Sequence, residues 1–191
     1  MEPRARVALL KLAGVFSCAA VFSVLAVAPV RAAPVYSSRE QALARAFPPP
    51  ATIERKTYFL TDAERGKASK LARSKIESSL VVAYLGRGPK GLLGTAYFDT
   101  HTVRTMPETL LVTVRPDGSL EGVEVVAFNE PEDYLPRPAW LRLFTGRRLD
   151  NDLAVGRGLA HVTGATLTTR SIAEAARRVL AIHSVVTKAA P

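Results

Sequence analysis

Two threonines near the C-terminus bracket a pair of small residues, in the run Thr163-Gly164-Ala165-Thr166. Gly164 lets the backbone adopt conformations that a β-carbon would disfavour, and Ala165 adds almost no bulk. We therefore expect the Thr166 hydroxyl to stand on an open loop that a large reagent can approach. A helix is predicted after the loop, and the first N–H groups of a helix favour a bound phosphate. Without further context, the same residues also fit an ordinary turn followed by a helix cap.

The helix behind this loop is predicted from a stripe of apolar residues. They recur at alternating spacings of three and four: Ile172, Ala175, Val179, Ile182 and Val186. One face of the helix should therefore pack on a sheet. Ser171 and Glu174 fit a capping box at its start. A cap at Thr168 or Thr169 would instead bring free N–H groups closer to the loop. Glu174 and Arg178 are also spaced for an ion pair on the helix surface.

Short apolar and β-branched runs separated by tight turns predict a mainly antiparallel sheet. The predicted strands cover residues 79–85, 91–98, 109–115 and 120–128. Pro116-Asp117-Gly118-Ser119 is typical of a hairpin turn. Gly86-Arg87-Gly88-Pro89-Lys90-Gly91 has the spacing of a dinucleotide-binding loop, but a strand follows it where such a loop needs a helix, so we interpret it as another hairpin turn. The expected fold class is α+β: a mainly antiparallel sheet packed by flanking helices, in a single domain after an apolar leader.

Three shorter helices are predicted around this sheet. The first covers residues 37–47, with a serine cap at its start and three prolines after its end. The second opens with a capping box of Thr61 and Glu64 and runs to about Arg73. The third covers residues 138–144 and starts with a proline, which suits the first turn of a helix.

Three motifs follow one another in an order that is more specific than any one of them. They are Phe128-Asn129-Glu130-Pro131, the spaced set Trp140-Leu141-x-x-Phe144-x-Gly146, and Thr163-Gly164-Ala165-Thr166. This ordered set, over about residues 91–182, resembles the FMN-binding domain family. The family includes the covalent-flavin subunits of RNF-type electron-transport complexes and of the sodium-translocating NADH:quinone reductase. In the family, the last Thr of the motif carries FMN through a phosphoester bond that a flavin transferase makes from FAD, with magnesium.

The resemblance implies a function and a set of site residues. Thr166 would be the attachment point of FMN rather than a catalyst. The other residues that would contact FMN are Thr163, Gly164, Ala165, Thr168, Glu130, Tyr134 and Trp140. The chain would be an electron carrier within a redox chain rather than a stand-alone enzyme. It would pass electrons between a membrane redox partner and an exported acceptor.

Two other classes of function stay open. The family often has an Asp three residues before its motif, and this chain has Ala160 there. FMN could therefore bind without a covalent bond. The chain could also be a flavin-free exported interaction module that uses a basic surface on a lipid or a partner.

The first 32 residues have the pattern of an export signal. Basic residues precede an uncharged run from Leu12 to Val30, and Val30-Arg31-Ala32 offers a cleavage site. The run is also long enough for an uncleaved signal anchor, which would associate the chain with the membrane. Either interpretation places the rest of the chain in the periplasm or on the extracytoplasmic face of the membrane. The predicted parts are a leader (1–32), an N-terminal helical segment (33–78) and an FMN-binding-like domain (79–191).

Composition argues against several other classes of function. The chain has 26 basic and 17 acidic residues, of which the leader holds four and one, so the net charge without the leader is +6. These charges are scattered, without the aromatic–basic platform of a nucleic-acid-binding protein, and fit a surface near anionic lipid better. Cys18, the one cysteine, lies in the leader, and His101, His161 and His183 lack metal-ligand spacing, so no metal site is predicted. His101 and His161 are expected at the surface or around the flavin site.

Overall fold

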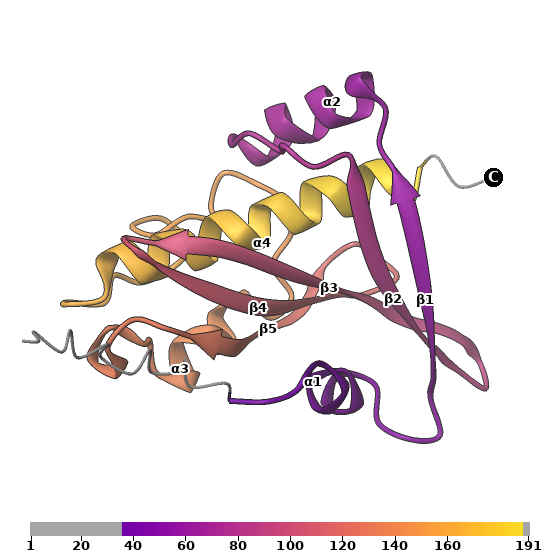
Figure 1. Cartoon of the computed structure of the whole chain (residues 1–191), viewed down its shortest axis with the longest axis horizontal. Helices are drawn as coiled ribbons and strands as arrows, with labels where there is room; N and C mark the ends of the chain where they lie inside the picture. The colour runs from indigo at the N-terminus through magenta and orange to yellow at the C-terminus, as the bar shows by residue number, and fades with distance from the viewer. Residues whose placement is uncertain (1–35, 189–191) are drawn as a thin grey trace, which may run out of the picture. The chain divides into compact units, whose positions relative to one another are not determined.

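The computed structural model describes residues 36–188, so the predicted leader lies outside the described part of the chain. The centre of the fold is one five-stranded sheet in the order β1-β2-β3-β4-β5 (Figure 1). The strands are β1 (Thr52–Phe59), β2 (Leu80–Gly88), β3 (Gly91–Val103), β4 (Met106–Val114) and β5 (Leu120–Phe128). Every neighbouring pair is antiparallel. The predicted α+β class, with an antiparallel sheet in a single domain, is confirmed.

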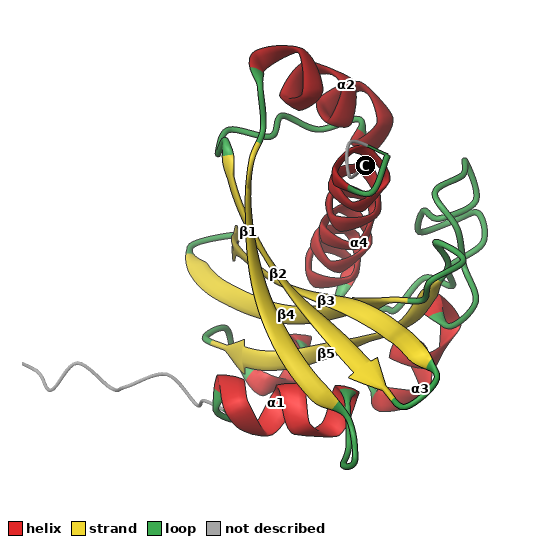
Figure 2. Cartoon of the chain, turned by 90° about the vertical axis from the view of Figure 1, so that its right-hand side faces the viewer, coloured by secondary structure: helices red, strands yellow, loops and turns green. Residues whose placement is uncertain are grey.

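Helices lie on both faces of this sheet (Figure 2). The long helix α4 (Thr166–Val186) crosses one face, and α2 (Asp62–Ala72) packs against α4. The first helix, α1 (Arg39–Ala46), lies on the other face. Three short helical turns, η1 (Glu132–Tyr134), α3 (Pro138–Leu141) and η2 (Arg142–Phe144), follow β5. Among residues 36–188, no helix has both the length and the apolar character needed to cross a bilayer.

The two faces of the sheet bury separate apolar clusters because side chains alternate along each strand. On β4, Leu110, Val112 and Val114 belong to the cluster that includes α4. Leu111, between them in sequence, belongs to the cluster that includes α1 and the residue after it, Phe47. The predicted apolar stripe on α4 is confirmed, because its residues belong to the first cluster or pack against it.

Two glycines let Phe47 pack directly on the sheet. A β-carbon on Gly86 would lie 2.2 Å from the Phe47 ring, which leaves no room for any larger residue. A β-carbon on Gly94 would lie 2.8 Å from Val114 O and 3.5 Å from the same ring. The close approach holds the end of α1 near the turn between β2 and β3.

Local signals predicted the ends of the first two helices correctly. Ser38 caps α1 and Thr61 caps α2, each through a complete capping box. The residue after α2, Arg73, adopts a left-handed conformation with φ 60°, which ends the helix. The hairpin turns predicted after β2 and β4 are also present, the second with Gly118 at φ 80°.

Strand β1 was not predicted from the sequence, and two local predictions are wrong. Most residues of β1 are exposed on both faces, so no apolar alternation marks the strand. The long helix starts at Thr166, without a side-chain cap, rather than at any of the caps that were considered further along. Arg178 binds Asp99 of β3 instead of pairing with Glu174, because α4 lies over β3 and this face of the helix is not free in solvent.

Candidate functional site

The predicted attachment residue is the first residue of α4. Thr166 follows the N-cap residue Ala165, whose side chain makes no capping hydrogen bond. At this end the Thr169 N–H donates to Ala165 O over 2.9 Å. The N–H groups before it lie ahead of the regular helical hydrogen bonds, as at every helix N-terminus. A ligand with negative oxygens can accept from these groups, and the helix dipole favours its charge.

The loop in front of Thr166 is open. Thr163 and Gly164 are exposed, and a β-carbon on Gly164 would meet no atom within 4 Å. Gly164 has φ +85°, which glycine adopts without strain. Thr166 itself is half-buried, so its side chain reaches the surface rather than being enclosed by the core.

The other threonines of the first turn lie inside. Thr168 and Thr169 are 2% and 0% exposed, and Ala165 is also buried. The Thr169 hydroxyl lies 3.0 Å from Ala165 O and 3.1 Å from Thr166 O, to which it donates. These contacts fix the backbone on which Thr166 stands. Within this turn, Thr166 is therefore the threonine that a ligand can reach.

Trp140 anchors the segment that leads into the loop. Its indole Nε1–H donates to Ala160 O over 2.8 Å, and its ring packs edge-on against Phe144 at 5.3 Å between centroids. The side chain is 7% exposed and belongs to the core around α4. In this structure Trp140 positions the loop backbone, and its ring is occupied by core contacts.

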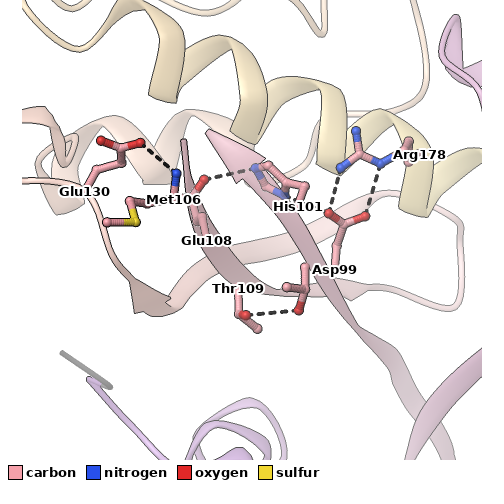
Figure 3. Close-up of polar contacts among 8 residues, drawn as sticks. Asp99, His101, Met106, Glu108, Thr109, Glu130 and Arg178 are labelled. Atoms are coloured by element: carbon pink, nitrogen blue, oxygen red, sulfur yellow. Dashed lines mark hydrogen bonds and ion pairs between the residues drawn. The ribbon is translucent and has the colours of Figure 1, made fainter. Parts of the chain in front are cut away.

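Glu130 and Tyr134 hold the turn between β3 and β4. The Glu130 carboxylate accepts hydrogen bonds from the N–H groups of Thr105 (3.3 Å) and Met106 (3.2 Å), as Figure 3 shows for Met106. The guanidinium of Arg104 lies 4.4 Å from the centre of the Tyr134 ring. Arg104 has φ 51°, so the two contacts fix a turn that contains a left-handed residue.

The predicted site residues thus form two groups. The loop Thr163–Thr166 and Thr168 lie at the start of α4, and Trp140 bonds Ala160 just ahead of this loop. Glu130 and Tyr134 lie at the β3–β4 turn. Both places are at the left-hand end of the view in Figure 1. In the part of the chain that the structure describes, no hydrogen bond or ion pair joins the two groups. Their roles toward FMN stay predictions.

A buried ionic cluster beneath α4 was not expected from the sequence (Figure 3). His101 Nδ1 lies 2.9 Å from Asp99 Oδ1, and His101 Nε2 lies 3.1 Å from Glu108 Oε2. Arg178 closes the row with two bonds to Asp99, of 2.7 and 3.2 Å. The Glu108 side chain is fully buried, and that of His101 is 12% exposed. Of the two places expected for His101, the surface is therefore wrong, because the strand turns it under the helix, and a place around the flavin site stays a prediction.

The charges of this cluster follow from the balance between burial and pairing. Burial works to lower the pKa of His101, but hydrogen bonds and charges from Asp99 and Glu108 outweigh it and raise the pKa to about 9. Burial would raise the pKa of Asp99, but His101 and Arg178 bring it below its usual range. For Glu108, burial dominates and raises the pKa. His101 is thus an imidazolium at neutral pH.

A second polar pair continues the row along the same strand. Tyr97 Oη lies 2.9 Å from His183 Nδ1, and both side chains are buried between β3 and α4. Burial lowers the pKa of His183, which is therefore neutral, and raises the pKa of Tyr97. The spacing of Tyr97, Asp99 and His101 by two residues was the available signal, since such residues share one face of a strand. We call this row, with Glu108, Arg178 and His183, the polar ladder.

The larger hollows do not involve the loop. A cavity of about 420 Å³ is lined by β5 and residues between 135 and 145, and one of about 410 Å³ by α2 and the segment that follows it, residues 62–77. Neither is lined by Thr163, Gly164 or Thr166. Within residues 36–188, no three His, Cys, Asp or Glu side chains are grouped so as to hold a metal ion. The loop therefore offers an accessible hydroxyl beside a helix start, which suits a phosphate.

Comparisons with known proteins bear on the fold. No protein-family model matches the sequence, and no curated protein matches it. A solved structure, NqrC from Shewanella oneidensis, is similar with a TM-score of 0.52. The match covers 77% of this chain and 88% of NqrC, at 18% sequence identity. This likeness shows an NqrC-like fold.

Proposed function

We propose that this chain is an extracytoplasmic electron-transfer flavoprotein that carries FMN through a phosphoester bond to Thr166. The observation that carries the proposal is the position of Thr166, a half-buried hydroxyl residue at the first position of a 21-residue helix without a side-chain cap. Two further observations support it. The ordered motifs resemble those of the FMN-binding domain family, and the fold is similar to that of NqrC.

The residues present fit the phosphate end of FMN. The Thr166 hydroxyl supplies the oxygen of the ester, and the N–H groups of the first turn of α4 face the same space without a side chain competing for them. Gly164 leaves the approach clear, since nothing lies within 4 Å of where its β-carbon would be. Maturation from FAD would form the bond between the threonine oxygen and the FMN phosphorus, with AMP leaving.

The protein's contribution is to hold and orient the cofactor. FMN, when bound, supplies one- and two-electron redox chemistry that no side chain of this chain offers. Trp140 fixes the backbone at Ala160, and the buried Thr169 fixes the first turn, so Thr166 stands on a rigid support. A covalent bond also prevents loss of the cofactor outside the cytoplasm, where a released flavin is diluted. The partners implied are a flavin transferase for maturation and a membrane redox partner for electrons.

The test is covalent flavin on the exported chain. The full chain is expressed with an active flavin transferase and separated on a denaturing gel. We expect a flavin-fluorescent band, with an intact mass that includes one FMN and reports leader cleavage at the same time. Thr166→Val should remove both signals. Thr57→Val, a threonine replacement on the distant strand β1, is the matched control and should keep them.

The family often has an Asp at the position that Ala160 occupies in this chain. This difference favours a second candidate, non-covalent FMN binding. In that case the native protein is yellow, but the flavin leaves on denaturation and Thr166→Val keeps part of the native colour. A colourless native protein, with no rise in melting temperature on adding FMN, contradicts both flavin functions. It would favour a flavin-free interaction module.

A further inference from the structure

The sheet face that carries α1 is only partly covered. Phe59 and Leu80, which face each other in the β1–β2 register, are 76% and 49% exposed. A hollow of about 260 Å³ lies on this face, beside α1. Its lining residues are Arg39, Arg55, Leu80, Val82, Tyr84, Phe98 and Thr100. Since α4 crosses the opposite face, this hollow is separate from the Thr166 loop (Figure 2).

Two cations from different elements line the hollow. Arg39 is the first residue of α1, and Arg55 lies on the edge strand β1. Within the described part of the chain, neither guanidinium forms a salt bridge, and no lining residue is acidic. By contrast, Arg87 on the neighbouring strand is paired with Glu54 at 2.8 Å. The hollow therefore keeps a positive charge that residues 36–188 do not pair with a carboxylate.

Aromatic residues hold one of the two cations in place. The guanidinium carbon of Arg39 lies 4.9 Å from the centre of the Phe98 ring, and its Nη1 lies 3.5 Å from Tyr84 Oη. Tyr84 and Phe98 are packed edge to face, with 5.6 Å between ring centroids. Tyr84 is 8% exposed, so this support is fixed. A guanidinium that is oriented before a ligand arrives loses less conformational entropy on binding.

The remaining lining residues define the shape of a suitable ligand. Leu80 and Val82 give an apolar wall, and the Thr100 hydroxyl, 3.0 Å from that of Thr109, adds a hydrogen-bonding group at the rim. We propose that this hollow binds a phosphate-bearing ligand with an apolar body. Arg39 and Arg55 take the phosphate oxygens, and the apolar body lies against Leu80 and Val82. The head group of an anionic phospholipid and a soluble phosphate ester share this chemistry.

The test is calorimetric titration of the full chain with two soluble probes. Phenyl phosphate represents a soluble ester, and dihexanoyl phosphatidylglycerol below its micelle concentration represents the lipid head group. Replacing either cation, as Arg55→Gln or Arg39→Gln, should weaken binding about tenfold, since a charged hydrogen bond is lost. Lys67→Gln removes the same charge from the exposed side of α2 and should leave the affinity unchanged.

The probes also distinguish the two sources of the ligand. Tighter binding of the short lipid assigns the site to a phospholipid head group, and tighter binding of phenyl phosphate assigns it to a soluble ester. Inorganic phosphate should bind more weakly than both, because it lacks the apolar body. If Arg39→Gln disturbs α1, as seen by circular dichroism, Arg55→Gln on the exposed strand still gives the answer. Absence of heat with both organic probes, or an equal loss in Lys67→Gln, would overturn the proposal.

Discussion

The start of α4 and its second half use polar residues in opposite ways. At the start, Thr166 reaches the surface, Gly164 keeps the approach clear, and the first N–H groups have no side-chain cap. In the second half, the polar ladder pairs Arg178 with Asp99 and His183 with Tyr97 under the helix. Polar groups that folding leaves open, as at the start of α4, are available to a ligand. Polar groups that are paired within the protein, as in the polar ladder, contribute to stability instead.

Two adjacent arginines of α4, Arg177 and Arg178, have different partners, and within residues 36–188 Arg177 forms no ion pair with a carboxylate. Arg177 is 7% exposed, yet its Nε and Nη2 donate to Ala72 O and Leu71 O at the end of α2, over 3.3 Å each. The carbonyls at a helix C-terminus carry partial negative charge, so they can replace a carboxylate. Burial nevertheless lowers the pKa of Arg177. Arg178, one residue on, binds a carboxylate instead, and the two side chains tie α4 to α2 and to β3.

The largest expected effect comes from breaking the ladder at its most connected residue. Asp99→Ala leaves Arg178 and the imidazolium of His101 without their shared carboxylate in a mostly buried place. We expect a loss of about 3 kcal/mol in the free energy of unfolding, measured by urea denaturation. Asp62→Ala, at an exposed pair with Arg65, is the matched control and should cost less than about 1 kcal/mol. Equal losses in the two variants would mean that the ladder contributes no more than a surface pair.

The next effect is a dependence of stability on pH. The pKa of His101 is about 9 when folded, above its ordinary value near 6.5, so its contribution is complete below pH 6.5 and is lost as the pH rises to 9. The raised pKa of Glu108 acts in the same direction, beginning at lower pH. The lowered pKa of Asp99 acts at the acid side, where its contribution is lost as the pH falls below about 4. Unfolding free energies between pH 6 and 9 should fall by about 2 kcal/mol, after allowance for partial solvent screening.

His101→Gln is the control for this pH dependence. It keeps a hydrogen-bonding side chain of similar size but cannot titrate, so the slope between pH 6 and 9 should become shallower. Nuclear magnetic resonance titration of the His101 ring gives the folded pKa independently. A value near 6.5 in the folded chain would contradict the charge assignment of the ladder.

A smaller effect is expected at the neutral pair of the ladder. Tyr97→Phe removes the hydroxyl that bonds His183 Nδ1 and leaves this buried ring nitrogen without its partner. The cost should be about 1 kcal/mol by thermal or urea unfolding. The double variant Tyr97→Phe with His183→Leu replaces both polar partners by apolar side chains, and it should recover part of this loss. If the double variant loses more unfolding free energy than the two single variants added together, the pair does not act alone.

Sequence reasoning succeeded where a local pattern decides the structure. The capping residues Ser38 and Thr61, the hairpin turns and the apolar stripe on α4 all follow from neighbours within a few residues. It failed at β1, because an edge strand exposed on both faces lacks alternation and is specified by its pairing with β2. Such pairing joins residues far apart in the chain, and local patterns do not contain it.

The site divides in the same way. The open loop at Gly164 and the accessible Thr166 could be predicted, since small residues and a following helix are local signals. The start of α4 at Thr166 could not, because no capping side chain marks it. The partner of Arg178 was also hidden, since Asp99 meets it only after β3 folds under the helix. The polar ladder is a tertiary feature, whereas the loop is a local one.

The smallest effect is expected at the loop itself, and it gives the comparison its sharpest test. Thr166 makes no side-chain hydrogen bond within residues 36–188, so Thr166→Val in the flavin-free chain should change the unfolding free energy by less than about 0.5 kcal/mol. The same change should abolish covalent flavin. Thr169→Val, three residues on, removes a buried hydroxyl that bonds two carbonyls, and it should cost about 1 kcal/mol while keeping the residue proposed to carry FMN. A large loss of stability in Thr166→Val would place its hydroxyl among the paired groups of the fold, and the contrast between the open start of α4 and its paired second half would fail.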